Sequence, residues 1–406
     1  MKKWIVVLIL IFVETVCAEL TILKTEFNRA PLNIVEEEAN KGVAEAQAEL
    51  AFRYYAGHQV AKNQTASFEW MSKAAGKKHL GALLALFQMY VEGIGIAVDP
   101  QKAEDVFISA IIVGTGDARI QPMFDRWVEN KKNSGGNVQE FMKKCADSGY
   151  GPAYSAVYYP VAMEFYQKGQ YEQALPLLVE LSRHGDSMGT FYLAQMYAKG
   201  EGSLPQDAVE AFALYQQAAT NGNGLAQVEL AAMYSAGLVV EPDAEMVRFW
   251  LNEAAEQGQR EAQYKLAELE FAAAVAAEDS IQLPNEVGQR VKKEFEQRMD
   301  RAVFWYKAAA EQSHPDALYM LGRLYASGDH VLQDFSKAVH YYQAAVAQGH
   351  NEALFYLGLM HHAGIGVEKD VPAAVSFYQQ AATQGVTGAL YYLGNGYRSG
   401  IGVQQN

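Results

Sequence analysis

The chain repeats a short pattern about every 36 residues. In the most regular copies an alanine is followed by leucine four residues on, tyrosine or histidine eight on and glycine eleven on, as in Ala353, Leu357, His361 and Gly364. The first position of successive copies is Ala46, Ala82, Ala118, Ala153, Gly189, Ala226, Ala262, Ala317, Ala353 and Ala389. Self-similarity at this period predicts a stacked array in which each unit buries its apolar face against its neighbours.

Each unit is predicted to be a pair of antiparallel helices. Residues 351–362 place small and apolar side chains at helical spacing. Gly364 and Gly366 then break the helix with a short turn. Residues 371–384 carry a second apolar stripe, with Pro372 in its first turn and Gly385 after it. The chain is therefore expected to be all-α.

The repeated residues resemble the Sel-1-like repeat family, which is related to tetratricopeptide repeats. The resemblance is carried by Glu45-Ala46-Gln47 with Leu50, Glu261-Ala262-Gln263 with Leu266, Tyr197–Gly200, Tyr234–Gly237 and Ala254-Ala255-Glu256-Gln257-Gly258. It implies a right-handed α-solenoid of about nine and a half antiparallel helical hairpins over residues 44–406. It also implies an adaptor for multiprotein complexes, and several exported bacterial members of the family are similar to envelope or host-interaction factors.

Three units depart from the pattern. The unit at 117–151 has Pro122 where leucine is expected and a polar stretch over 130–137, which predicts a degenerate repeat with a loop. The unit at Ala153 lacks the long loop and reads more like a tetratricopeptide hairpin. Residues 272–298 hold an insertion that should lengthen both helices of its unit around a turn at 283–285. The insertion is either a contact element or a tolerated extension.

The first 18 residues have the features of a signal peptide. Two lysines precede an apolar run over residues 4–13, and Val16-Cys17-Ala18 fits a cleavage site. A run of this length is too short to span a bilayer, so we expect an exported protein, periplasmic or secreted. Lipid anchoring through Cys17 is the alternative. Residues 19–43 should follow as an N-terminal capping segment, with its helix over residues 31–41.

Charge argues against two classes of partner. Without Lys2, Lys3 and Glu14, which lie in the leader, 31 basic and 46 acidic side chains remain, a net charge of −15. Such a chain is not suited to nucleic acid or to anionic lipid. Cys145 would then be the one remaining cysteine, and a buried apolar role is expected for it.

Motifs for catalysis, cofactors and metals are missing from the sequence. There is no phosphate-binding loop, no Gly-x-Ser-x-Gly and no His-Glu-x-x-His. His361 and His362 are adjacent, so they point to different faces of one helix. We therefore expect a non-enzymatic protein without cofactor or metal.

A concave surface is the remaining candidate for a binding site. By analogy with tetratricopeptide arrays, the second, sixth and ninth positions after the repeat alanine should face it. Aromatic, basic and amide side chains at these positions make a plausible contact surface. The predicted partner-binding residues are Tyr319, Arg323, Phe355, His362, Tyr391, Asn395 and Arg398. The aromatic members lie 36 residues apart, so they are equally well explained as packing positions.

The function expected from these features is an exported scaffold that binds a protein or peptide. An envelope role, such as exopolysaccharide-export assembly, and a host-interaction role are both open. Direct carbohydrate binding is the alternative, because sugars stack on aromatic side chains. The array stops on the first helix of a unit, which predicts either an edge covered by another chain or a shortened sequence.

Overall fold

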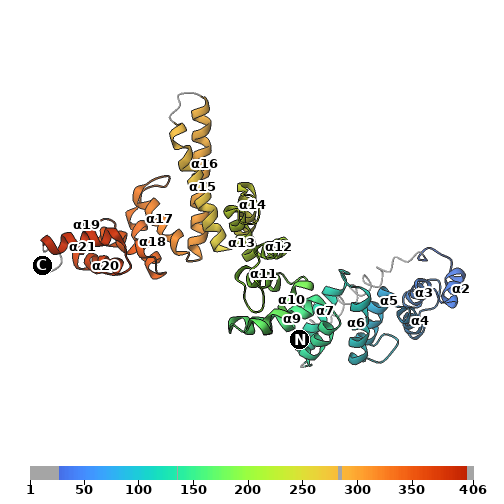
Figure 1. The fold of residues 1–406 in the computed structure, drawn as a ribbon. Helices are drawn as coiled ribbons and strands as arrows, with labels where there is room; N and C mark the ends of the chain where they lie inside the picture. The colour runs from blue at the N-terminus through green and yellow to red at the C-terminus, as the bar shows by residue number, and fades with distance from the viewer. Residues whose placement is uncertain (1–26, 135, 282–285, 400–406) are drawn as a thin grey trace. The chain divides into compact units, whose positions relative to one another are not determined.

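The computed structural model describes residues 27–134, 136–281 and 286–399, and over these ranges the chain forms twenty helices and no strand. This confirms the predicted all-α array of helical hairpins (Figure 1). The leader and Cys17 lie outside the described residues. The chain divides into two compact units, residues 1–189 and 190–406, which are taken one at a time below.

Unit 1 contains nine helices over its described residues. They are α2 (Leu32–Lys41), α3 (Ala44–Ala56), α4 (Gln64–Gly76), α5 (Leu80–Glu92), α6 (Pro100–Val113), α7 (Ile120–Asn133), α8 (Val138–Asp147), α9 (Gly151–Gln167) and α10 (Tyr171–Arg183). Successive helices pack against each other as hairpins. Helix α7 is the exception, since it makes few contacts with its neighbours, and α6 also contacts α8.

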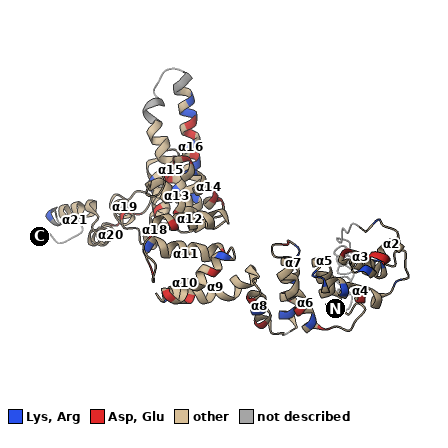
Figure 2. Ribbon diagram, turned by 45° about the vertical axis from the view of Figure 1, so that its right-hand side comes forward, with Lys and Arg blue, Asp and Glu red and all other residues tan. Residues whose placement is uncertain are grey.

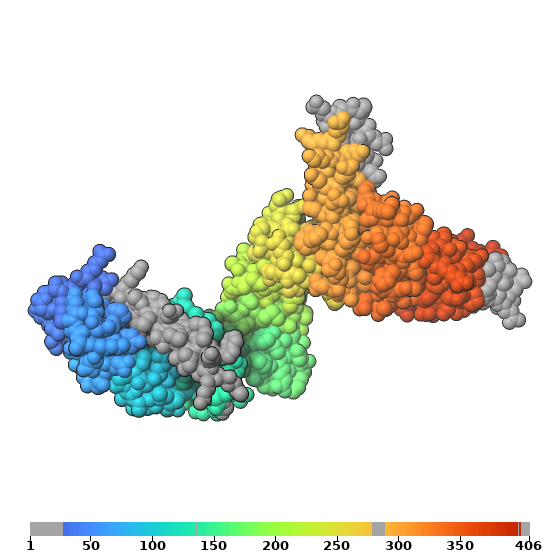
Figure 3. All heavy atoms as spheres, turned by 180° about the vertical axis from the view of Figure 1, so that it is seen from behind, coloured from blue at the N-terminus to red at the C-terminus, as the bar shows by residue number. Residues whose placement is uncertain are grey.

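Unit 2 holds the most regular repeats. Its helices are α11 (Ser187–Lys199, which begins at the end of unit 1), α12 (Ala208–Thr220), α13 (Gly224–Ala236), α14 (Ala244–Glu256), α15 (Arg260–Ile281), α16 (Glu286–Glu311), α17 (Pro315–Ser327), α18 (Phe335–Ala347), α19 (Asn351–Ala363), α20 (Val371–Thr383) and α21 (Thr387–Ser399). The insertion does lengthen both helices of its unit, α15 and α16. We call this hairpin the arm; it stands out from the rest of unit 2 in Figures 1 and 3. Its expected turn lies outside the described residues.

The turn between the two helices of a repeat is held by one repeated set of contacts. In the repeat at Ala353, Gly364 ends α19 with φ 71°, a left-handed conformation that glycine adopts without strain. The backbone N–H of Asp370 then donates to the carbonyl of His361 at 2.9 Å. The Asp370 carboxylate caps α20 by accepting from Ala373 N at 2.9 Å. The same contacts explain why tyrosine or histidine, glycine and aspartate recur together.

The repeat alanine is buried in nearly every repeat of the described residues. Ala46, Ala82, Ala153, Ala226, Ala262, Ala317, Ala353 and Ala389 are all fully buried. Ala118 is the exception, since it is exposed and precedes α7. Ala118 belongs to the unit that the sequence marks as degenerate, and it does not lie in a helix. Pro122 falls in the first turn of α7, where its missing N–H has no helical partner to lose.

The expected polar loop over 130–137 is also only partly a loop. Helix α7 continues to Asn133, and α8 begins at Val138 with Asn137 as its cap. Lys131 gives the reason, because its ammonium pairs with the buried carboxylate of Glu104 on α6. A charge-assisted contact of this kind keeps the end of α7 helical against the neighbouring helix.

The N-terminal end of the array is closed by one buried arginine. Arg53 on α3 is fully buried and pairs with Glu49 at 2.9 Å. Its Nη2 donates to the carbonyls of Phe27 at 3.0 Å and Ala30 at 2.8 Å. Arg53 therefore ties the segment before α2 to the first repeat.

Candidate partner-binding surface

The predicted surface residues of the repeat at Ala317 lie together on α17. Tyr319 is half-buried, and its ring stacks on the His350 ring with centroids 4.3 Å apart. Arg323 is exposed, with its guanidinium 5.9 Å from the Tyr319 ring centroid. Burial raises the pKa of Tyr319 to about 12, so its hydroxyl stays protonated at neutral pH. Tyr319 thus packs between two repeats, while Arg323 remains open to a partner.

The repeat at Ala353 brings a second set together. Phe355 is half-buried, and its ring lies 5.7 Å from that of Tyr392 on α21. A Cβ atom on Gly388 would lie 2.8 Å from Phe355 Cζ, so the ring fits against a position without a side chain. His362 is half-buried, with its ring 6.3 Å from Tyr378 and 6.4 Å from Tyr392. Phe355 and His362 are therefore joined through aromatic packing.

The most accessible part of the predicted set lies on α21. Leu390 and Tyr391 are 54% and 67% exposed, and Arg398 is exposed as well. Asn395 is half-buried. Tyr391, Asn395 and Arg398 are four and three residues apart, so they share one face of the helix. Ring contacts from Tyr319 to Tyr356 and from Tyr356 to Phe355 connect the residues of α17 with those of α19.

Buried tyrosines of the second helices recur with the period of the repeat, and the sequence already indicated that Tyr378 fills a gap between helices. Tyr306, Tyr342 and Tyr378 lie 36 residues apart and are almost completely buried. A Cβ atom at Gly322 would sit 2.6 Å from the Tyr342 ring, and one at Gly358 would sit 2.6 Å from Tyr378. The sequence signal was the glycine five residues after the repeat alanine, paired with a tyrosine twenty residues later. Tyr342 and Tyr378 each fill the space that this glycine leaves open.

The hydroxyls of these tyrosines reach different environments. Tyr306 donates a hydrogen bond to Glu268, which lies six residues after the repeat alanine. The Tyr378 hydroxyl is buried and makes no hydrogen bond with any residue in the described ranges. Burial raises the pKa of all three phenols. They are protonated packing groups with no role as bases.

Three histidines cap first helices. Nδ1 of His350 accepts from Ala353 N at 3.1 Å, and Nδ1 of His79 accepts from Ala82 N at 3.0 Å. His314 caps α17 in the same manner. An accepting Nδ1 requires the neutral ring with its proton on Nε2. Nε2 of His350 faces the Asp316 carboxylate at 3.3 Å, which links the cap to the preceding repeat.

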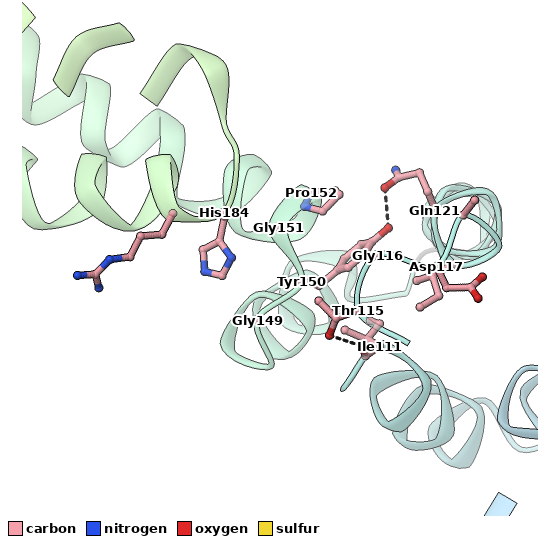
Figure 4. A pocket seen from close by; sticks show the side chains of 13 residues that line it. Ile111, Thr115, Gly116, Asp117, Gln121, Gly149, Tyr150, Gly151, Pro152 and His184 are labelled. Carbon is pink, nitrogen blue, oxygen red and sulfur yellow. Dashed lines mark hydrogen bonds between the residues drawn. The ribbon is translucent and has the colours of Figure 1, made fainter. Parts of the chain in front are cut away.

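Unit 1 has a pocket of about 410 Å³ where the repeat spacing is disturbed (Figure 4). It lies at the ends of α6 and α10 and the starts of α7 and α9, with Tyr150, Gln121, Pro152 and His184 among its walls. The Tyr150 hydroxyl donates to Gln121 Oε1 at 2.6 Å. Asp117 is held by Arg119, which lowers its pKa to about 2. The pocket suits a side chain of a partner better than acid–base chemistry, because its carboxylate and its phenol are both committed.

Metal and thiol chemistry find little support in the described residues. Within them no group of three or more histidine, cysteine or acidic side chains is placed to hold a metal ion. Cys145 is fully buried, and burial raises the pKa of its thiol to about 12. It packs as a small apolar residue, as the sequence indicated. Over the same residues, no helix has the length and apolar character needed to cross a membrane.

Known proteins resemble the chain in both sequence and fold. The Sel1 repeat matches residues 44–79, 81–105, 187–223, 224–259, 291–314, 315–350, 351–386 and 387–406, more than half of the chain. An uncharacterised protein of Neisseria meningitidis serogroup B is 29% identical over 166 residues, which cover 41% of this chain and 30% of that protein. The chain thus spans less than a third of that relative's length.

Two solved structures are similar over long stretches. A protective antigen of uropathogenic Escherichia coli strains, displaying an SLR fold, is 25% identical with a TM-score of 0.58; the match covers 93% of this chain and 85% of that one. A Sel1 repeat protein from Oxalobacter formigenes is 27% identical with a TM-score of 0.50, covering 61% of this chain and 93% of its own. Repeats of this kind typically mediate protein interactions in generally non-catalytic scaffolds. The chain belongs to the Sel1 repeat family.

Proposed function

We propose that the chain is an exported, non-enzymatic scaffold that binds a protein partner through the first helices of its C-terminal repeats. The observation that carries this proposal is the face of α21, where Tyr391 is 67% exposed beside exposed Arg398. An aromatic ring next to a guanidinium is typical of the residues that dominate protein interfaces. Arg323 on α17 adds an exposed cation to the same class of helix.

Two settings for this scaffold remain proposals. The leader motif supports export, to the periplasm or beyond. An envelope or exopolysaccharide-export assembly would use the array as a support for other proteins. The protective antigen of Escherichia coli shares the fold, and that likeness supports a host-interaction role for this chain.

The proposal is tested by affinity capture with residues 19–406 as bait. Envelope extract and host-cell lysate serve as separate sources of prey. The test bait carries Tyr391→Ala and Arg398→Gln, which alter exposed side chains; changing Tyr319 or Phe355 would also disturb packing between repeats. The control bait carries Phe304→Ala, a 60% exposed aromatic on a second helix. We expect a partner that is retained by the control and lost from the test bait.

Processing of the leader has its own test. Mass spectrometry of the exported protein should give a chain that begins at Glu19. A lipid adduct on Cys17 would replace the soluble product with an anchored one. In that case the scaffold proposal stands and the localisation changes.

Direct carbohydrate binding is the second candidate, favoured by the same face of α21. Tyr391 offers an exposed ring, and Asn395 and Arg398 follow it on one side of the helix. Sugars pair a stacked ring with polar groups that bond their hydroxyls. Binding to uncharged polysaccharide, lost on Tyr391→Ala and with no captured protein, would favour this candidate over the scaffold.

A further inference from the structure

Three arginines converge on one buried carboxylate at the base of the arm. Glu270 on α15 is 3% exposed at its side chain and pairs with Arg248 from α14. Its Oε2 also accepts from Arg301 Nη2 on α16 at 2.9 Å. Arg298 Nη1, on the same helix, lies 3.5 Å from that oxygen. We call these four residues the arginine cluster.

The arginine cluster carries more positive charge and more donors than its carboxylates can use. Each guanidinium has five N–H donors, while a carboxylate offers about four lone-pair sites. Glu294 adds a second carboxylate, 2.8 Å from Arg298 Nη2, and it is 57% exposed. Three guanidiniums and two carboxylates leave one net positive charge. Arg298 Nη1 is buried yet hydrogen-bonds to no described residue.

One further arginine, Arg290, acts on the carboxylate of Glu294. The hydrogen bond from Arg298 lowers the pKa of Glu294, and its charge, followed by those of Arg290 and Arg301, lowers it further. Figure 2 shows basic and acidic segments following one another along α16. The whole chain has a net charge of −14. Local excess of the opposite sign attracts acidic groups that the rest of the surface repels.

The guanidiniums are also accessible from solvent. The side chains of Arg248, Arg298 and Arg301 are 35%, 23% and 48% exposed. One arginine would neutralise Glu270 and join α15 to a neighbouring helix. A second is matched by Glu294. The third exceeds that need, and holding extra positive charge at a partly buried site is unfavourable unless an anion joins it.

We propose that the arginine cluster binds a carboxylate from an acidic segment of a protein partner. Planar guanidiniums match a carboxylate through paired N–H donors, which gives both affinity and orientation. The inference rests on the proposed scaffold function and adds the chemistry of the partner. It also places one residue of the insertion, Arg298, in a contact site.

The test is a titration of residues 19–406 with two fluorescein-labelled peptides. One peptide holds six glutamates between glycines, and the other holds six glutamines. The glutamate peptide should bind and weaken with added salt, while the glutamine peptide should not bind. Arg301→Gln and Arg248→Gln should each weaken binding by about tenfold or more. Arg301→Lys should lose less, because it keeps the charge without the paired donors.

The matched control is Arg183→Gln in unit 1, which alters an exposed arginine that pairs with nearby Glu180. It should leave binding unchanged, and circular dichroism should show that all variants are folded. Equal binding of both peptides, or equal binding by all variants, would overturn the inference. So would inorganic phosphate that displaces the peptide at lower concentration than glutamate does, since the site would then take free anions.

The two proposals fail in different ways. A partner captured by the scaffold bait and retained by Arg301→Gln would overturn the arginine cluster as a docking site and leave the scaffold standing. Capture of no protein, with the glutamate peptide still bound through Arg301, would remove the scaffold and leave the carboxylate site.

Discussion

The repeat at Ala353 and the segment α6–α8 pack neighbouring helices in different ways. In the repeat, the missing side chain of Gly358 opens a space that the Tyr378 ring fills. In α6–α8 the rings of Phe107, Phe124 and Phe141 pack on one another, with Phe124 and Phe141 stacked at 5.9 Å. Where the spacing of small residues holds, a buried ring fits against a glycine of the neighbouring helix. Where it fails, large rings pack on one another.

The largest expected effect is in the regular repeat. Leu357 is 2% exposed, so Leu357→Asp buries a charge with no partner. We expect a loss of about 4 kcal/mol in the free energy of unfolding of the surrounding repeats. Urea unfolding followed by far-ultraviolet circular dichroism measures it. A neutral result would mean that this face of α19 is not in the core.

A large loss is also expected in the aromatic segment. Phe141 is fully buried, and Phe141→Ala would leave a cavity between α6 and α8. The expected destabilisation is about 3 kcal/mol. The variant should also let thiol reagents reach Cys145, four residues along α8. An unreactive thiol and unchanged stability together would show that the ring cluster does not hold this segment.

Two glycine variants sharpen the comparison with an intermediate effect. Gly358→Ala would place a Cβ 2.6 Å from the Tyr378 ring, so it should destabilise by about 2 kcal/mol. Gly394→Ala meets nothing within 4 Å and should be neutral or stabilising by up to about 1 kcal/mol. The pair is compared by thermal melting. Equal effects would mean that the glycine–tyrosine fit does not govern the stack.

The smallest expected effect is the pH dependence of the histidine caps. Burial holds the pKa of His350 and of His79 below the usual 6.5, against nearby carboxylates that act in the other direction. The unfolded chain therefore binds more protons below pH 6.5. Stability should be constant above that value and fall as pH drops through it toward the lower folded pKa.

A matched variant isolates this contribution. Asn223 fills the same capping position on α13, with Oδ1 accepting from Ala226 N at 2.9 Å. His350→Asn should keep the cap and reduce the loss of folding stability between pH 7 and pH 5. An unchanged slope in urea titrations at these pH values would remove His350 from the account.

Local sequence spacing predicted most of the fold. The repeat alanines, the turn glycines and the lengthened insertion follow from short-range patterns, and they mark helices and turns in the structure. Ala118 does not lie in a helix as the other repeat alanines do, because a phenylalanine cluster and not the repeat spacing sets the packing of this segment. The loop expected from residue 130 was wrong for the last turn of α7, because a carboxylate distant in sequence, Glu104, pairs with Lys131.

The candidate surface was less accessible to sequence reasoning. Spacing could not decide whether Tyr319 faces a partner or the next repeat, because its stacking on His350 depends on helices that meet only in the fold. The arginine cluster draws its residues from three helices. Arg248 and Arg301 lie 53 residues apart in the chain. No local sequence motif predicts such a site.

The most direct measurement of the central proposal is hydrogen exchange of residues 19–406 with and without the captured partner. We expect slower exchange on α17, α19 and α21, with further protection at the base of the arm. Protection confined to the second helices α18 and α20, or no change along the array, would contradict binding through the first helices.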